Sequence, residues 1–357
     1  MDFLKNPEIQ SDFDLERYYK ILCPEYPDFL NPYVALPIMQ RLGGIGLLCG
    51  TDWTPLFHNK FFYSRLNHSV GVALIIWNFT KDKRQTLSGL FHDIATSAFS
   101  HVLDFKNGDS LKQESTEFQT ISIINEDMEL SQQLFSEGIY KYEVDNYHRY
   151  PIADNEIPGL SADRLEYMFP SGAALDALWK MDEIADLYPH ICVLENEKGF
   201  SELGFDDSFA ATAYTKKFAE IALILQHNED KIAMQLLADV ISRAQECNLI
   251  SNEELFMLEE RSIIAGFDKI ASDKIDKEFS KLYRTFRQMK KIIRSQKPLP
   301  DCYSISLEVK RRYVNPIVRT QNGYKRISQI SKEASDSIQE LLHFSDSVYG
   351  CVPYAEI

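Results

Sequence analysis

The sequence is poor in cysteine, in long apolar runs and in positive charge. It holds six cysteines among 357 residues and no Cys-x-x-Cys pair, which argues against a thiolate zinc site and against a disulfide scaffold. The most apolar stretch, VGVALIIW at 70–77, is too short to cross a bilayer. Lys and Arg number 38 and Asp and Glu 53, so the net charge is −15. This balance argues against nonspecific binding to nucleic acid or to an anionic membrane.

Two sequence patterns are also missing. The acidic N-terminus has no signal-peptide pattern, so we expect a cytoplasmic, reducing environment. The glycine-rich stretch GGIGLLCG at 43–50 lacks the Lys-Ser/Thr ending of a phosphate-binding loop. A locally basic cleft for a small anionic substrate is still compatible with the acidic composition.

Hydrophobic periodicity predicts a mainly α protein with a small antiparallel β element near the C-terminus. Residues 303–310 alternate apolar and polar side chains, which is typical of a strand, and Asn322-Gly323 predicts a hairpin turn. The helices are expected at 34–49, 68–82 with Asn67 as N-cap, 86–103, 116–137, 160–168, 172–185, 207–228, 229–249, 252–262, 274–295 and 331–344. The stretches 141–160 and 186–206 are expected to be irregular.

The same pattern suggests a division of the chain into three parts. Residues 1–33 form an irregular lead-in with one short helix, 34–190 a helical core, and 191–357 a helical region that carries the β hairpin. No flexible linker separates the last two parts, so they are expected to pack as one compact unit. Three basic pairs, at 216–217, 311–312 and 325–326, are expected to be solvated, with an allosteric nucleotide site as the alternative.

Four side chains are candidate ligands of one divalent metal ion: His68, His92, Asp93 and Asp163. Imidazole and carboxylate together suit Mn, Fe, Ni, Zn or Mg, and the sequence does not choose among them. A groove between helices would let these residues meet although they are distant in sequence. Such an ion could polarise a phosphoryl oxygen and lower the pKa of bound water. The alternative is that His92 and Asp93 are ordinary hydrogen-bonded structural residues.

Five motifs in order along the chain resemble one family. They are QRL at 40–42, SRLNHSVGV at 64–72, GLFHDI at 89–94, FSH at 99–101 and DRLEY at 163–167. Their order and spacing resemble the HD-domain superfamily of metal-dependent phosphohydrolases, and more narrowly its deoxynucleoside-triphosphate triphosphohydrolase branch. The likeness is good over residues 37–170 and looser over 303–318. It implies an HD-type helical core that binds the metal through the four ligands named above.

The resemblance also implies roles for further residues. Gln40 matches a residue that contacts the nucleotide sugar, and Tyr167 one that packs against it. Arg65 and Arg164 match basic residues that contact phosphate, a role that suits the guanidinium fork. The implied partner is therefore a small phosphorylated substrate, expected to be a nucleotide, and relatives in this branch suggest a homo-oligomer.

The pattern breaks at the expected catalytic histidines. The family's Gly-His after the His-Asp pair is replaced by Ala95 and Thr96, and its His-Glu by Gln113 and Glu114. Threonine cannot act as a general acid or base near neutral pH. Of the catalytic set only His101 remains beside Asp93, and Glu114 is a possible substitute base if burial raises its pKa.

The alanines in this segment also predict an altered geometry. A helix running through 86–103 would carry His101 roughly 12 Å along the axis from Asp93, beyond direct reach of the metal. Thr96, one turn after His92, would then take the position near the metal and contact the substrate.

Three functions are compatible with these observations. The first is a metal-dependent phosphohydrolase that acts on a nucleotide or related phosphate ester through metal-activated water. The second is a regulatory protein that binds metal and nucleotide with weak or no turnover, because Thr96 and Gln113 replace histidines. The third is a structural helical protein without metal. We expect the first.

Overall fold

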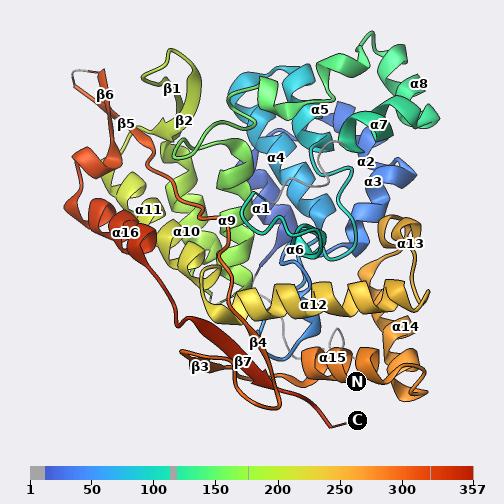
Figure 1. Ribbon diagram of the computed structural model, residues 1–357. Helices are drawn as coiled ribbons and strands as arrows, with labels where there is room; N and C mark the ends of the chain where they lie inside the picture. The colour runs from blue at the N-terminus through green and yellow to red at the C-terminus, as the bar shows by residue number, and fades with distance from the viewer. Residues whose placement is uncertain (1–12, 113–118, 176, 322, 357) are drawn as a thin grey trace.

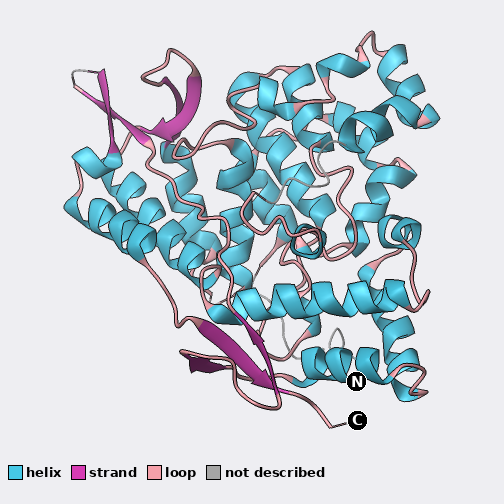
Figure 2. Cartoon of the chain, viewed as in Figure 1, coloured by secondary structure: helices cyan, strands magenta, loops and turns pink. Residues whose placement is uncertain are grey.

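The computed structural model describes residues 13–112, 119–175, 177–321 and 323–356. Helices dominate, and two small sheets lie at the edges of the helical body (Figure 2). The helices are α1 Leu15–Leu22, α2 Asn31–Val34, α3 Pro37–Gln40, α4 Arg65–Thr80, α5 Lys83–Phe91, α6 Val102–Lys106, α7 Gln119–Glu126, α8 Met128–Ser136, α9 Ala162–Ala174, α10 Met181–Leu187, α11 Ser208–Ile224, α12 Asn228–Glu246, α13 Asn252–Met257, α14 Glu260–Ser272, α15 Lys277–Gln288 and α16 Lys332–His343. The predicted mainly α class is confirmed.

The strands form two sheets. They are β1 Ile191–Glu195, β2 Ser201–Phe205, β3 Ile293–Ser295, β4 Cys302–Ile305, β5 Ile317–Thr320, β6 Gly323–Arg326 and β7 Tyr349–Pro353. One sheet has the order β1-β2-β5-β6, in which β2 and β5 run parallel, and the other is the antiparallel β3-β7-β4. The hairpin β5–β6 stands where the Asn-Gly turn predicts it, with Thr320 opposite Gly323, although Asn322 lies outside the described residues.

Two hydrophobic clusters make up the interior. The first surrounds α4, which is buried along most of its length and packs against α5 and α9. The second surrounds α12, against which α6 and α15 pack. Figure 1 shows α12 crossing the molecule below α4 and α9, while the chain between β4 and β5 runs up past α9. A cavity lined by residues of both clusters lies between them.

Several predicted elements differ from the structure. Only α3 and a 3₁₀ turn occupy the region 34–49, because three glycines weaken a helix there and a Cβ at Gly44 would collide with Glu259. The helix predicted at 68–82 begins at Arg65, since Ser64 rather than Asn67 is its N-cap and its Oγ accepts from the Asn67 amide. The segment 186–206 is not irregular but contains the β1–β2 hairpin.

The predicted continuous helix 86–103 is wrong. α5 ends at Phe91, and the chain turns back on itself before α6 begins at Val102. Phe99 and Ser100 have φ of 64° and 52°, a left-handed conformation that no α-helix contains. The backbone amides of Ala98 and Phe99 donate to Leu255 O and Glu260 Oε1 instead of to the preceding turn. Tertiary hydrogen bonds therefore override the helical propensity of the alanines.

Candidate metal centre

Helix α4 delivers His68 to the centre of the site. Four residues after the Ser64 cap, its imidazole is almost fully buried, with 1% of its surface exposed. Its Nδ1 bonds to Glu166 Oε2 at 2.5 Å, and its Nε2 lies 3.1 Å from Asp163 Oδ1. Asp163 and Glu166 are three residues apart on α9, so they face the same side of that helix. Packing of α4 against α9 thus brings an imidazole between two carboxylates.

His92 stands where α5 ends, and it points at the same place. Its Nδ1 donates to the Gly89 carbonyl at 2.7 Å, which leaves Nε2 as the acceptor nitrogen. His92 Nε2 lies 3.1 Å from His68 Nε2. One ligand atom each of His68, His92 and Asp163 lies within 4.8 Å of the others. Nitrogen and oxygen lone pairs that converge in this way fit a divalent cation, with mixed nitrogen and oxygen ligands.

Asp93 lies beside this group and is held by two neighbours. Arg65 Nη1 donates to its Oδ2 at 2.9 Å and Thr96 Oγ1 to its Oδ1 at 2.9 Å. Its Oδ2 is 3.5 Å from His92 Nε2 and 3.8 Å from His68 Nε2. All four predicted ligands are therefore neighbours, and Arg65 and Thr96 orient the fourth.

The charges of the site determine its protonation. Burial disfavours charge on Asp93 and Asp163, but Arg65 beside the former and His68 beside the latter hold both pKa values well below their usual range. Burial also lowers the pKa of His68, yet Glu166 and Asp163 outweigh this effect and raise the pKa to about 10. A metal ion would have to displace that proton, because only the neutral imidazole is a ligand.

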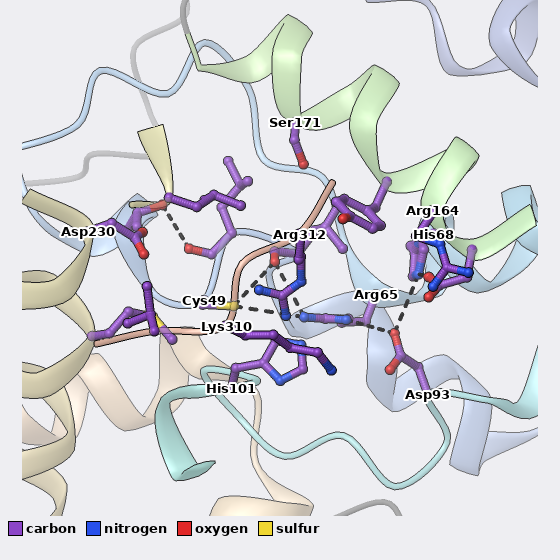
Figure 3. Close-up of a pocket in the computed structure, with 18 of the residues that line it drawn as sticks. Cys49, Arg65, His68, Asp93, His101, Arg164, Ser171, Asp230, Lys310 and Arg312 are labelled. Carbon is purple, nitrogen blue, oxygen red and sulfur yellow. Dashed lines mark hydrogen bonds and ion pairs between the residues drawn. The ribbon is translucent and has the colours of Figure 1, made fainter. Parts of the chain in front are cut away.

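His101 lines the same cavity as the metal ligands, although the straight helix that was predicted to carry it does not exist. The turn at Phe99 and Ser100 redirects the chain, so His101 lines the cavity that contains the metal-ligand cluster (Figure 3). Its Nδ1 bonds to Asp104 Oδ2 at 2.8 Å. Burial lowers the pKa of His101, and Asp104 partly counters this shift. A neutral imidazole oriented by a carboxylate is suited to proton transfer.

Basic and aromatic side chains line the rest of the cavity, whose volume is about 230 Å³. Arg65, Arg164, Lys310 and Arg312 bring positive charge. Arg164 is braced by Gly159 O at 2.9 Å and by Asp154 at 3.2 Å. The Tyr167 hydroxyl is buried and has no hydrogen-bond partner among the described residues. This lining matches the predicted roles of Arg65, Arg164 and Tyr167 in position, while contact with a substrate stays a prediction.

The structure places two of the predicted substrate-binding residues outside the cavity lining. Gln40 is exposed on the surface, donates to Val34 O at 2.7 Å and does not line the cavity. Thr96 does not line it either, because its hydroxyl is directed to Asp93. Glu114, like Gln113, lies outside the described residues.

Sequence reasoning missed several residues of the site. Glu166 lies in the DRLEY motif, three residues after Asp163, and that spacing could have identified it. Lys310 and Arg312 line the cavity, whereas the pair 311–312 was expected to be solvated. The loose likeness over 303–318 was the only signal for them. Asp230, at the start of α12, had no sequence signal.

Exchange of Glu166 for glutamine should weaken metal binding about 10- to 100-fold, the usual cost of losing a partner that orients a metal-bound histidine. The reason is that Glu166 Oε2 bonds to His68 Nδ1 and orients the ring, while Oε1 accepts from the Tyr63 hydroxyl. Titration of the metal-free protein with Mn²⁺ measures this. Glu183→Gln, at an exposed ion pair with Lys217, is the control. Equal affinity of Glu166→Gln and wild type would contradict the assignment.

Comparison with known proteins adds the fold. No family model matches the sequence. Over 132 residues, 36% of this chain, it is 31% identical to the uncharacterized protein YdhJ of Bacillus subtilis (strain 168), and the match spans 38% of that protein. A phosphohydrolase from Bacteroides thetaiotaomicron has a TM-score of 0.62 at 17% identity, over 93% of this chain and 97% of that one. A hypothetical protein from Aquifex aeolicus has a TM-score of 0.60 at 15% identity, over 92% of each chain. The chain therefore has the fold of a phosphohydrolase over nearly its whole length.

Proposed function

We propose that the protein is a metal-dependent phosphohydrolase whose substrate is a nucleotide or a related phosphate ester. The observation that carries the proposal is the convergence of His68, His92 and Asp163, with Asp93 alongside, in a cavity that also holds His101 and basic side chains. The likeness in fold to a phosphohydrolase supports it. The choice of a nucleotide rests on the sequence resemblance to the triphosphohydrolase branch.

Each group in the cavity has a chemical role in this proposal. A divalent ion held by the four ligands would stabilise negative charge on phosphoryl oxygens and activate water. Lys310 and Arg312 bind the non-reacting phosphate oxygens, since both carry charge into the cavity. Arg65 keeps Asp93 ionised and in place. Asp104 engages His101 Nδ1, which leaves Nε2 to exchange a proton with the leaving group or water.

The other predictions about the protein's setting stand as such. No helix among the described residues is long and apolar enough to span a membrane. The cytoplasmic location, the homo-oligomer and the division of the chain at 33 and 190 stay predictions.

A product assay with a panel of nucleoside mono- and triphosphates and added Mn²⁺, Mg²⁺, Ni²⁺ or Zn²⁺ tests the proposal. We expect turnover that a chelator abolishes and added metal restores. In the same assay His101→Asn should lower kcat by roughly 10² to 10⁴, the usual contribution of one general acid or base. His190→Asn is the matched control, since His190 is also bonded to an aspartate, Asp206, but at an exposed position.

Two outcomes would contradict these expectations. Metal and nucleotide bound without any turnover would favour the regulatory alternative. Normal kcat in His101→Asn would remove the proton-transfer role from that residue and leave the phosphohydrolase proposal standing.

A further inference from the structure

One carboxylate in the cavity has no part in the metal centre. Asp230 lies in the first turn of α12, and Figure 3 places it across the cavity from His68 and Asp93. Arg312 lies between the two ends in that view. The metal ligands and Asp230 therefore mark opposite ends of the space that a substrate would fill.

The Asp230 carboxylate forms no hydrogen bond with any residue in the described part of the chain. Burial raises its pKa to about 7, and the charges of Arg312 and Lys231 act in the opposite direction. Asp230 is half-buried and its side chain lines the cavity, so its carboxylate faces the space that a ligand would occupy. A carboxylate with a perturbed pKa that lines a cleft without a protein donor is a candidate for ligand recognition.

The start of α12 does not require this carboxylate. An acid near the N-terminus of a helix stabilises it through the helix dipole. Asp346 and Glu229 already fill this role for α12. Asp346 Oδ2 accepts from the Asn228 amide at 2.9 Å. Glu229 lies in the same turn and is paired with Arg294 at 2.8 Å. Asp230 is thus the acid of this turn that faces the cavity.

The wall near Asp230 offers the surroundings of a recognition site. Met234 lies one turn further along α12, and with Leu225 it lends apolar surface to the cavity. Ser171 of α9 is only 6% exposed, lines the cavity and makes no side-chain hydrogen bond within the described ranges. The Tyr167 hydroxyl has no partner there either. Apolar walls with a few unpaired polar groups are typical of small-molecule sites.

We propose that Asp230 determines substrate specificity by accepting hydrogen bonds from a pair of adjacent N–H or O–H donors on the part of the substrate away from the reacting phosphate. This inference rests on the proposed function. The two carboxylate oxygens of Asp230 can accept from two donors that lie side by side. The negative charge of the carboxylate strengthens both hydrogen bonds. Two parts of a nucleotide offer such pairs: the N1–H and N2 amine edge of guanine, and the vicinal diol of ribose.

The test compares wild type with Asp230→Asn on matched substrates in the metal-loaded protein. GTP and ITP differ in the N2 amine, and GTP and 2′-deoxy-GTP differ in one hydroxyl of the diol. We expect kcat/KM for the substrate with both donors to fall about 10- to 100-fold in Asp230→Asn, with a change below about threefold for its matched analogue. Glu229→Gln, in the same helical turn outside the cavity, should leave the GTP-to-ITP and GTP-to-2′-deoxy-GTP ratios of kcat/KM unchanged.

A second measurement separates this inference from the proposed function. Guanosine, inosine and 2′-deoxyguanosine, which carry no phosphate, are titrated into the wild-type protein and into Asp230→Asn by calorimetry. A changed guanosine-to-inosine ratio assigns Asp230 to the base, and a changed guanosine-to-deoxyguanosine ratio assigns it to the sugar. If both ratios stay within twofold in turnover and in binding, or if there is neither turnover nor nucleoside binding, the inference is overturned. If turnover persists and the Asp230→Asn ratios match wild type, the role of Asp230 is overturned and the phosphohydrolase proposal stands. If there is no turnover but the binding ratios change, the phosphohydrolase proposal is overturned and the role of Asp230 stands.

Discussion

Replacement of His92 by alanine should abolish bound metal and reduce turnover by at least about 10³-fold, because a catalytic metal ion contributes several kcal/mol to stabilising the transition state. His92 Nε2 lies 3.1 Å from His68 Nε2 and belongs to the closest group of ligand atoms. Its ring donates to Gly89 O, lies beside His68 and packs against Tyr147, so the variant's folding has to be measured along with its metal content. Elemental analysis of the purified variant and the product assay measure both effects.

The control for this prediction is His190→Ala. His190 is half exposed and bonds to Asp206, far from the cavity lining, so metal content and turnover should match wild type. A His92→Ala protein that keeps about one metal ion per chain and near-normal turnover would contradict the assignment of His92 as a metal ligand. Thermal unfolding of the variant guards against the simpler explanation that the protein has not folded.

Glu260→Ala should destabilise the protein by about 3–5 kcal/mol, the range for breaking a buried hydrogen-bond network. Glu260 is completely buried and accepts three hydrogen bonds, from the amides of Gly46 and Phe99 at 3.0 Å each and from Trp53 Nε1 at 2.7 Å. Its loss leaves three N–H donors without a partner. Urea unfolding at pH 7 measures the change, with the exposed Glu253→Ala expected to cost less than about 1 kcal/mol.

The pH dependence gives a second check on Glu260. Burial raises its pKa to about 7, and burial raises that of neighbouring Asp52 to about 6. The folded protein therefore binds more protons than the unfolded chain between about pH 4.5 and 7, so this contribution to stability is lost as the pH rises through that window. The slope should be shallower in Glu260→Ala. A variant within 1 kcal/mol of wild type and with the same slope would show that Glu260 does not anchor the turn.

The metal ligands could be predicted from sequence because each can be recognised from the few residues around it. Each of His68, His92, Asp93 and Asp163 lies in a short motif, and the helices that carry them have clear periodicity. The folding of α4 against α9 then brings the motifs together. The same reasoning explains why Glu166 was within reach: it shares a helix face with Asp163.

The shape of the segment after Asp93 could not be predicted, because partners far along the chain determine it. Ala98 and Phe99 are compatible with a helix, but their bonds to Leu255 and Glu260 hold the chain in a turn. Most of helix α14, from residue 263 to 272, lay outside the predicted elements, although Glu260 itself fell in the helix predicted at 252–262. The position of His101 depends on this turn, which local propensity opposes, so its distance from Asp93 along a helix could not be a guide.

The chain between β4 and β5 carries Lys310 and Arg312 past α9. These two residues are synthesised long after the metal ligands. All four metal ligands are synthesised by residue 163, whereas these two cations leave the ribosome almost 150 residues later, with β5 still to come. The metal ligands therefore all come from the first half of the sequence, whereas the basic wall of the cavity takes two of its cations from the last fifth. Replacing Lys310 or Arg312 in the intact chain should therefore weaken phosphate binding and leave the metal content unchanged, because neither residue belongs to the group of ligand atoms.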